Sequence, residues 1–209
     1  MLTVDSLLGS GAPPLIAILR GITPDEAPAV GAALLDAGIS LMEVPLNSPD
    51  PFTSIARLQA EFGDRVLVGA GTVLDVAAVD RLAGTGARLL VTPNTNPAVI
   101  ARALGHHLET IPGVLTPTEA FAAVAAGARR LKVFPAFVQG PRYLGALAEV
   151  LPRQVRLWAV GGVDAGNIGE WLAAGAEGVA IASGLYRAGL APAEVRERAL
   201  RLVDAAAAA

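Results

Sequence analysis

The cations of this chain are unevenly distributed, because its 209 residues include 15 arginines and a single lysine, Lys132. Arginine can replace lysine wherever only a surface charge is needed. It cannot do so where a neutral amine must attack a carbonyl carbon, because the guanidinium keeps its proton at every working pH. Lys132 is therefore a candidate nucleophile. The competing interpretation is a surface cation that chance left as lysine.

The residues around this lysine predict where its amine points. Lys132 lies in the apolar run RLKVFP (130–135), in which strand alternation places Lys132 and Phe134 on one face and Leu131 and Val133 on the other. If the two aliphatic residues face outward, the amine enters an apolar interior. Burial lowers the pKa of a lysine and suits it to Schiff-base chemistry. The alternative is an edge lysine whose amine reaches solvent.

A carboxylate occupies a similar place in the run ISLMEV (39–44), where Glu43 lies on the face opposite its two apolar neighbours. A carboxylate within a strand needs a partner or a role. Glu43 could pair with Lys132 or act as a general acid/base with a tuned pKa. A structural ion pair with Arg20 is the alternative.

Further candidates end other apolar runs. The planar fork of Arg20 matches a substrate carboxylate. Glycines after the last two runs expose backbone N–H groups at expected helix starts, where TIM barrels often bind phosphate. The alternatives are helix caps and plain tight turns. The candidate pocket and phosphate residues are Thr72, Asn47, Pro93, Phe134, Gly161, Gly162, Ser183 and Gly184.

The elements that must position these residues follow a simple alternation of short apolar runs and stretches with helical spacing. The runs are continuous, as expected for parallel strands with a covered outer face. No GxGxxG follows the first run, which disfavours a doubly wound sheet. We therefore predict one α/β domain over residues 1–209, a (β/α)8 TIM barrel. The runs span 15–19, 39–44, 66–70, 88–93, 108–113, 130–135, 156–162 and 178–183.

Composition excludes several classes of function. The chain has no cysteine, a net charge of −3 and no apolar run near the roughly 20 residues of a membrane span, so neither nucleic acid nor a membrane is an expected partner. The first residues lack a basic segment, and a cytoplasmic location is expected. His106 and His107 are expected side by side on a strand, with His107 near Glu109. Their side chains would point to opposite faces, so no metal site is predicted.

The motifs of the whole chain resemble those of the class I 2-keto-3-deoxy-6-phospho-sugar-acid aldolases, the KDPG and KHG aldolase family. They occur in the family's order and cover nearly the full length. They are AILRG (17–21), EVPLNSP (43–49), VGAGTVL (68–74), VTPN (91–94), PGVLTPTEA (112–120), LKVFPA (131–136), AVGGV (159–163) and SGLYRAG (183–189).

This resemblance implies a TIM barrel, a homotrimer without a cofactor, and reversible cleavage of a phosphorylated keto acid into pyruvate and D-glyceraldehyde 3-phosphate. It implies that Lys132 forms the Schiff base and that Glu43 is the general acid/base. It places the pyruvate contacts on Arg20 and Thr72. The implied phosphate contacts are Gly161, Gly162 and Ser183.

Two positions distinguish branches of the family. Pro45 and Asn47 stand where phosphogluconate enzymes typically have threonine and arginine, so EVPLNSP resembles the branch acting on 2-dehydro-3-deoxy-6-phosphogalactonate in galactonate catabolism. Ala182 stands where the family pattern has glycine. The alternatives are the same chemistry on the gluconate epimer or on 4-hydroxy-2-oxoglutarate. Alternatives of another class are a phosphate-binding epimerase or transferase, and a non-catalytic phospho-sugar binder.

Overall fold

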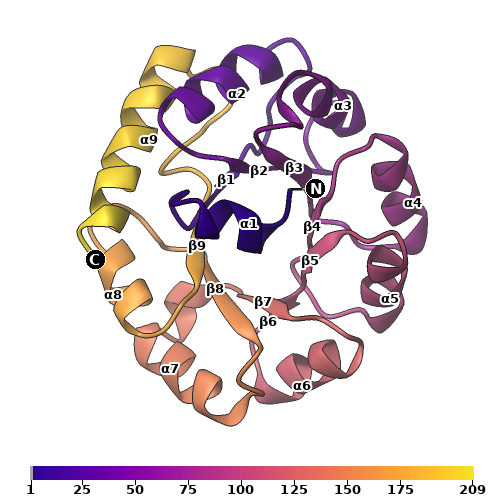
Figure 1. The fold of residues 1–209 in the computed structure, drawn as a ribbon, viewed down its shortest axis with the longest axis vertical. Coiled ribbons are helices and arrows are strands. Elements are labelled where there is room, and N and C mark those ends of the chain that lie inside the picture. The colour runs from indigo at the N-terminus through magenta and orange to yellow at the C-terminus, as the bar shows by residue number, and fades with distance from the viewer. Residues whose placement is uncertain (1) are drawn as a thin grey trace.

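Nine short strands pair in parallel in the computed structural model, which describes residues 2–209. Their order is β5-β4-β3-β2-β1-β9-β8-β7-β6. The two ends of this order, β5 (Glu109–Ile111) and β6 (Gly113–Val114), are separated in the chain by Pro112 alone. The fifth predicted strand is thus interrupted by a proline, and its halves pair with β4 on one side and β7 on the other. The sheet closes into the predicted barrel (Figure 1).

Each strand except the interrupted one corresponds to one predicted apolar run. The remaining strands are β1 (Leu15–Ile18), β2 (Leu41–Pro45), β3 (Leu67–Gly71), β4 (Leu89–Val91), β7 (Arg130–Val133), β8 (Arg156–Val160) and β9 (Gly178–Ile181). The helices are α1 (Val4–Gly9), α2 (Ala27–Asp36), α3 (Pro51–Phe62), α4 (Val76–Gly84), α5 (Pro97–Gly105), α6 (Pro117–Ala125), η1 (Ala136–Val138), α7 (Pro141–Val150), α8 (Ile168–Ala173) and α9 (Pro192–Ala207).

Strand alternation divides the apolar residues between two cores. The larger core lies between the barrel and the helices, and Leu131 and Val133 of β7 belong to it. The smaller core fills the barrel and includes Ile18, Trp158 and Val160. Because Leu131 and Val133 face outward, Lys132 faces inward, as the alternation of its run predicts.

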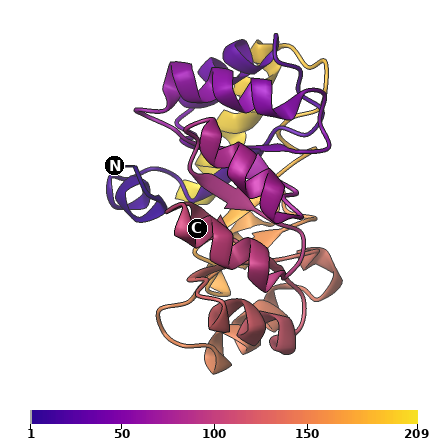
Figure 2. The same ribbon diagram turned by 90° about the vertical axis from the view of Figure 1, so that its right-hand side faces the viewer.

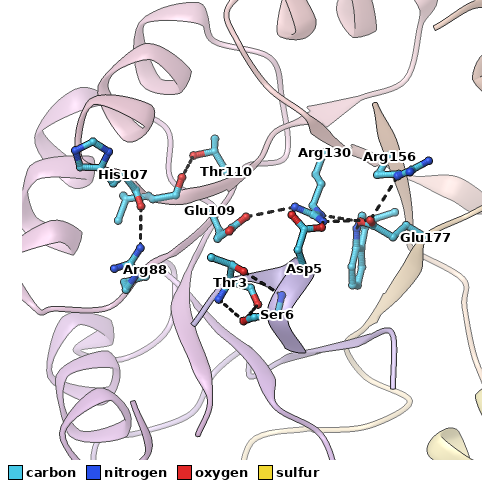
Figure 3. Close-up of polar contacts among 12 residues, drawn as sticks. Thr3, Asp5, Ser6, Arg88, His107, Glu109, Thr110, Arg130, Arg156 and Glu177 are labelled. Carbon is cyan, nitrogen blue, oxygen red and sulfur yellow. Dashed lines mark hydrogen bonds and ion pairs between the residues drawn. The ribbon is translucent and has the colours of Figure 1, made fainter. Parts of the chain in front are cut away.

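The barrel floor is closed by α1, which lies apart from the ring of helices at one end of the barrel (Figure 2). Arg130, the first residue of β7, donates from Nε to Glu177 Oε2 at 2.7 Å and from Nη2 to Asp5 of α1. Its Nη1 lies 3.5 Å from Glu109 Oε2 (Figure 3). These carboxylates compensate a buried guanidinium two residues before Lys132, so the network fixes the start of the strand that carries the lysine.

The two histidines do not lie on the strand that the sequence predicts for them. His106 and His107 are not on a strand, because His106 caps the C-terminus of α5 and His107 has a left-handed φ of 57°. Within residues 2–209, no group of three or more His, Asp or Glu side chains is placed to hold a metal ion. Glu109 contacts Arg130 instead of His107. In the same part of the chain, no helix is long and apolar enough to cross a membrane.

The stretch 164–175 has helical spacing that opens at Asp164, a common helix cap, and so predicts a helix from that residue, but the structure differs. Asp164 accepts a hydrogen bond from Gly166 N–H at 2.8 Å, which forms a turn, and α8 begins only at Ile168. Asn167 Oδ1 accepts from Asp164 N–H at 3.0 Å and stabilises the same turn. Side-chain to backbone bonds of Asp and Asn compete with helix formation in this way. The loop after β8 is consequently longer than the sequence indicates.

Candidate active site

A cavity of about 360 Å³ opens at the ends of β1, β7, β8 and β9. It lies at the C-terminal ends of the strands, where TIM barrels carry their active sites. Another cavity, of about 390 Å³, lies at the opposite end of the barrel beside Gln59 and Arg88, away from the lysine. The first cavity is lined by Ile18, Arg20, Lys132, Phe134, Val160, Gly161, Gly162, Val163, Asp164, Ala180, Ala182, Ser183, Gly184 and Arg187.

Lys132 is buried in the wall of this cavity. Its backbone N–H donates to Pro112 O at 2.8 Å, and the side chain is only 6% exposed. Its Nζ lies 4.5 Å from the centroid of the Phe134 ring. Burial lowers the pKa of the amine, Glu43 opposes this effect, and the positive charge of Arg20 adds to the lowering. A larger share of the lysine is therefore neutral than in water, and a neutral amine is the nucleophile that Schiff-base formation needs.

Glu43 is buried in the barrel interior on β2, where it is 2% exposed. Burial raises its pKa to about 7, while the charges of Lys132 and Arg20 act in the opposite direction. Its Oε2 has no hydrogen-bond partner within residues 2–209. The carboxylate occupies space left by Gly71, where an added Cβ would lie 1.9 Å from Oε2. An unsatisfied carboxyl group with a pKa near neutrality can both accept and donate a proton during turnover.

Arg20 does not form an ion pair with Glu43, which was the alternative to an acid/base role for Glu43. Its Nη1 donates instead to Asn47 Oδ1 at 2.7 Å, across the loops that follow β1 and β2. A second bond, from Gly21 N–H to Ser48 Oγ at 2.9 Å, joins the same loops. Asn47 thus orients a guanidinium at the cavity, although Asn47 is not a lining residue itself.

Two of the predicted residues, on the other half of the barrel, do not line this cavity. Thr72 follows β3 with a φ of 58°, an uncommon conformation for a residue other than glycine that often marks a functional site. Pro93 follows β4, and its backbone packs against Gly113, where an added Cβ would lie 2.3 Å from the Pro93 carbonyl carbon. Neither Thr72 nor Pro93 is among the described residues that line the cavity.

The two glycine-rich loops meet at the cavity. Gly161 and Gly162 have φ values of 99° and 73°, which only glycine adopts without strain. A Cβ on Gly162 would lie 2.6 Å from Phe137 Cβ, so this loop also needs glycine for its packing. Within residues 2–209, the N–H groups of Ser183 and Gly184 have no hydrogen-bond partner. Unpartnered N–H groups in a cavity are suited to bind an anion.

Sequence analysis missed two charged lining residues, Asp164 and Arg187. Asp164 precedes a stretch with helical spacing, so its residue type predicts a helix cap instead of a cavity residue. Arg187 lies inside the quoted motif SGLYRAG but follows the glycine loop by three residues. Its reach into the cavity depends on the turn at Ala182, whose carbonyl accepts from the N–H of Tyr186 at 2.9 Å. No spacing rule signals that turn.

Comparison with known proteins identifies the family. A model of the KDPG and KHG aldolase family matches residues 10–199. The chain belongs to this family. It is 48% identical over 192 residues to the 2-dehydro-3-deoxy-6-phosphogalactonate aldolase of Escherichia coli, covering 92% of this chain and 94% of that protein.

Solved structures agree with the family assignment. A structure described as native KDPGal is matched with a TM-score of 0.90 and 48% identity, over 92% of this chain and 93% of that one. A protein cage designed by fusing symmetric oligomeric domains is matched with a TM-score of 0.91 and 48% identity, over 92% and 72% of the two chains. The KDPG aldolase of Legionella pneumophila, with pyruvate captured as a covalent carbinolamine, gives a TM-score of 0.84 at 25% identity, over 91% and 94%.

Proposed function

We propose that this chain is a class I aldolase of galactonate catabolism, which cleaves 2-dehydro-3-deoxy-6-phospho-D-galactonate into pyruvate and D-glyceraldehyde 3-phosphate. The observation that carries the proposal is the single lysine of the chain, which lines the cavity at the C-terminal end of the barrel, is buried, and has a lowered pKa that the charge of the buried Glu43 influences. The identity to an aldolase with this activity supports the substrate assignment.

The reaction follows from the chemistry of the buried pair. Neutral Lys132 attacks the C2 ketone to give a carbinolamine, and loss of water gives an iminium ion that serves as the electron sink. Glu43, directly or through a water molecule, takes the proton of the C4 hydroxyl. The C3–C4 bond then breaks and glyceraldehyde 3-phosphate leaves. Protonation of the remaining enamine at C3 and hydrolysis of the iminium release pyruvate and restore the amine.

The remaining residues are assigned to substrate binding. We place Arg20 and Thr72 on the pyruvate side, with Asn47 orienting Arg20 through the 2.7 Å hydrogen bond. Phe134 lines the cavity as an apolar wall, and Pro93, which follows β4, is assigned to substrate binding as well. The phosphate is assigned to the backbone N–H groups of Gly161, Gly162 and Ser183, which follow β8 and β9.

The choice between C4 epimers rests on Pro45 and Asn47, which differ from the phosphogluconate pattern near the bond that breaks. We expect kcat/KM for the galactonate substrate to exceed that for the gluconate epimer. A coupled assay for pyruvate release, with both epimers at matched concentrations, measures the ratio. A higher kcat/KM for the gluconate epimer would assign the enzyme to the phosphogluconate branch of the family. A higher kcat/KM for 4-hydroxy-2-oxoglutarate would show that the enzyme does not require a phosphorylated substrate.

The proposed assembly is a homotrimer in the cytoplasm. Large apolar side chains are exposed on α6 and η1, where Phe121, Phe137 and Val138 are 46%, 66% and 55% exposed. Exposed apolar residues of this size are typical of surfaces that another subunit covers. The likeness to a domain used as a symmetric oligomer supports assembly from copies of the same chain. Light scattering of the purified protein measures the mass, and a monomer would contradict this part of the proposal.

A further inference from the structure

The phosphate end of the cavity has a feature that sets it apart from the usual phosphate site of a TIM barrel. Such sites place the anion at the N-terminus of a short helix, whose dipole supplies positive charge. Here α8 has six residues and begins at Ile168, seven residues after Gly161, and α9 begins at Pro192, nine residues after Ser183. Neither glycine loop therefore leads directly into a helix, and the loop after β9 forms only a single turn, closed by the bond from Tyr186 N–H to Ala182 O. A cationic side chain can supply the positive charge that a helix N-terminus supplies elsewhere.

The charged lining residues of the cavity are Arg20, Lys132, Arg187 and Asp164. Lys132 is buried deep in the barrel with a lowered pKa, and Arg20 is hydrogen-bonded to Asn47 at the end of β1. Asp164 adds a negative charge close to Gly162. Arg187, on the loop after β9, is the remaining cation in the described lining of the cavity.

Arg187 is placed on the phosphate loop by a specific contact. Its Nε donates to Ser183 O at 3.2 Å, which ties the guanidinium to the loop that holds the unpartnered N–H groups of Ser183 and Gly184. Within residues 2–209, neither Nη atom of Arg187 has a hydrogen-bond partner. The side chain lines the main cavity and an adjoining cavity of about 390 Å³ between Arg20 and Tyr186. Arg187 is exposed at the cavity, and its Nη atoms are free to bind an anion.

We propose that Arg187 is a phosphate-binding residue, which donates from its Nη groups to the phosphate oxygens while the backbone N–H groups of Ser183 and Gly184 bind the same anion. The planar guanidinium matches a phosphate with two parallel N–H groups, and its charge replaces the missing helix dipole. The inference rests on the proposed function for the identity of the substrate. The contact with an inorganic phosphate ion does not depend on that function.

A matched pair of variants separates direct binding from loop support. Arg198 of α9 also donates to Ser183 O, at 3.4 Å, but it pairs with Glu194 and is not among the described residues that line the cavity. Arg187→Ala should raise KM for the phosphorylated substrate by roughly tenfold or more, because a hydrogen bond to a charged group is lost. The same variant should lower kcat/KM for the unphosphorylated 4-hydroxy-2-oxoglutarate far less than kcat/KM for the phosphorylated substrate, and Arg198→Ala should change neither value greatly.

Calorimetric titration with inorganic phosphate gives a second measurement that needs no turnover. We expect wild type and Arg198→Ala to bind phosphate with similar affinity, Arg187→Ala to bind at least tenfold more weakly, and Arg187→Lys to recover part of the loss. Equal loss in both alanine variants, or unchanged phosphate affinity in Arg187→Ala, would overturn the inference. Phosphate binding through Arg187 without any pyruvate release would instead overturn the proposed function and leave the phosphate contact intact.

Discussion

Gly71→Ala tests the geometry of the buried acid without touching its chemistry. The added methyl would lie 1.9 Å from Glu43 Oε2, 2.3 Å from Cδ and 2.4 Å from Oε1. Gly71 ends β3 with an ordinary strand φ, so alanine introduces no backbone strain. These three nearest atoms all belong to the Glu43 carboxylate, which is 2% exposed and cannot swing into solvent.

The size of the effect follows from that contact. Non-bonded heavy atoms keep about 3.5 Å apart, so the carboxylate must move by roughly 1.5 Å. A misplacement of about 1 Å at a reacting group costs on the order of 100-fold in rate. Overpacking of a core costs about 1–3 kcal/mol of unfolding free energy. We therefore expect kcat to fall about 100-fold or more in a protein that still folds.

Pyruvate release measures kcat, and urea denaturation measures the unfolding free energy. In a Glu43→Ala background the carboxylate is absent, so adding Gly71→Ala should cost little further stability or activity. Gly84→Ala, at the end of α4 with open space around it, is the matched control and should leave both values nearly unchanged. If Gly71→Ala retained wild-type kcat, or cost as much in the Glu43→Ala background, the assigned role of the Glu43 position would be wrong.

Two further predictions concern buried charges. Burial raises the pKa of Glu43 from 4.5 to about 7, so the protonated carboxyl group stabilises the folded protein at low pH. This contribution, about 3 kcal/mol at about 1.4 kcal/mol per pKa unit, is present in full below about pH 4.5 and is lost as the pH rises from 4.5 through 7. Glu43→Gln should remove this dependence, and a pH-independent stability difference between wild type and variant would contradict it. Arg130→Leu leaves Glu109 and Glu177 uncompensated and should cost about 3–5 kcal/mol in urea denaturation. Asp5→Asn should cost under about 1 kcal/mol, because Asp5 is 82% exposed, and equal losses would be evidence against the network.

The alternation of apolar runs predicts the barrel well, because parallel strands buried on both faces leave a strong pattern in the sequence. It fails where one residue decides the local structure. Pro112 divides the fifth strand, and the Asp164 turn delays α8 to Ile168. In place of the expected strand, His106 caps the C-terminus of α5 and His107 follows it in a left-handed conformation.

The site is predictable where a polar residue interrupts an apolar strand. Lys132 and Glu43 are conspicuous for that reason, since a buried charge needs a compensating role. Residues whose position depends on a loop are not, as Arg187 shows. The bond between Arg20 and Asn47 likewise joins residues 27 positions apart, and only the pairing of β1 with β2 brings them together.

The central claim is that Lys132 forms a Schiff base with pyruvate. Borohydride reduction in the presence of pyruvate, followed by peptide mass spectrometry, tests it most directly, because the only other amine of the chain is its N-terminus. We predict one reduced pyruvate adduct on the peptide that contains Lys132, and neither adduct nor turnover in a folded Lys132→Arg variant. A wild-type protein that releases pyruvate without this adduct, or a Lys132→Arg variant that remains active, would contradict the claim.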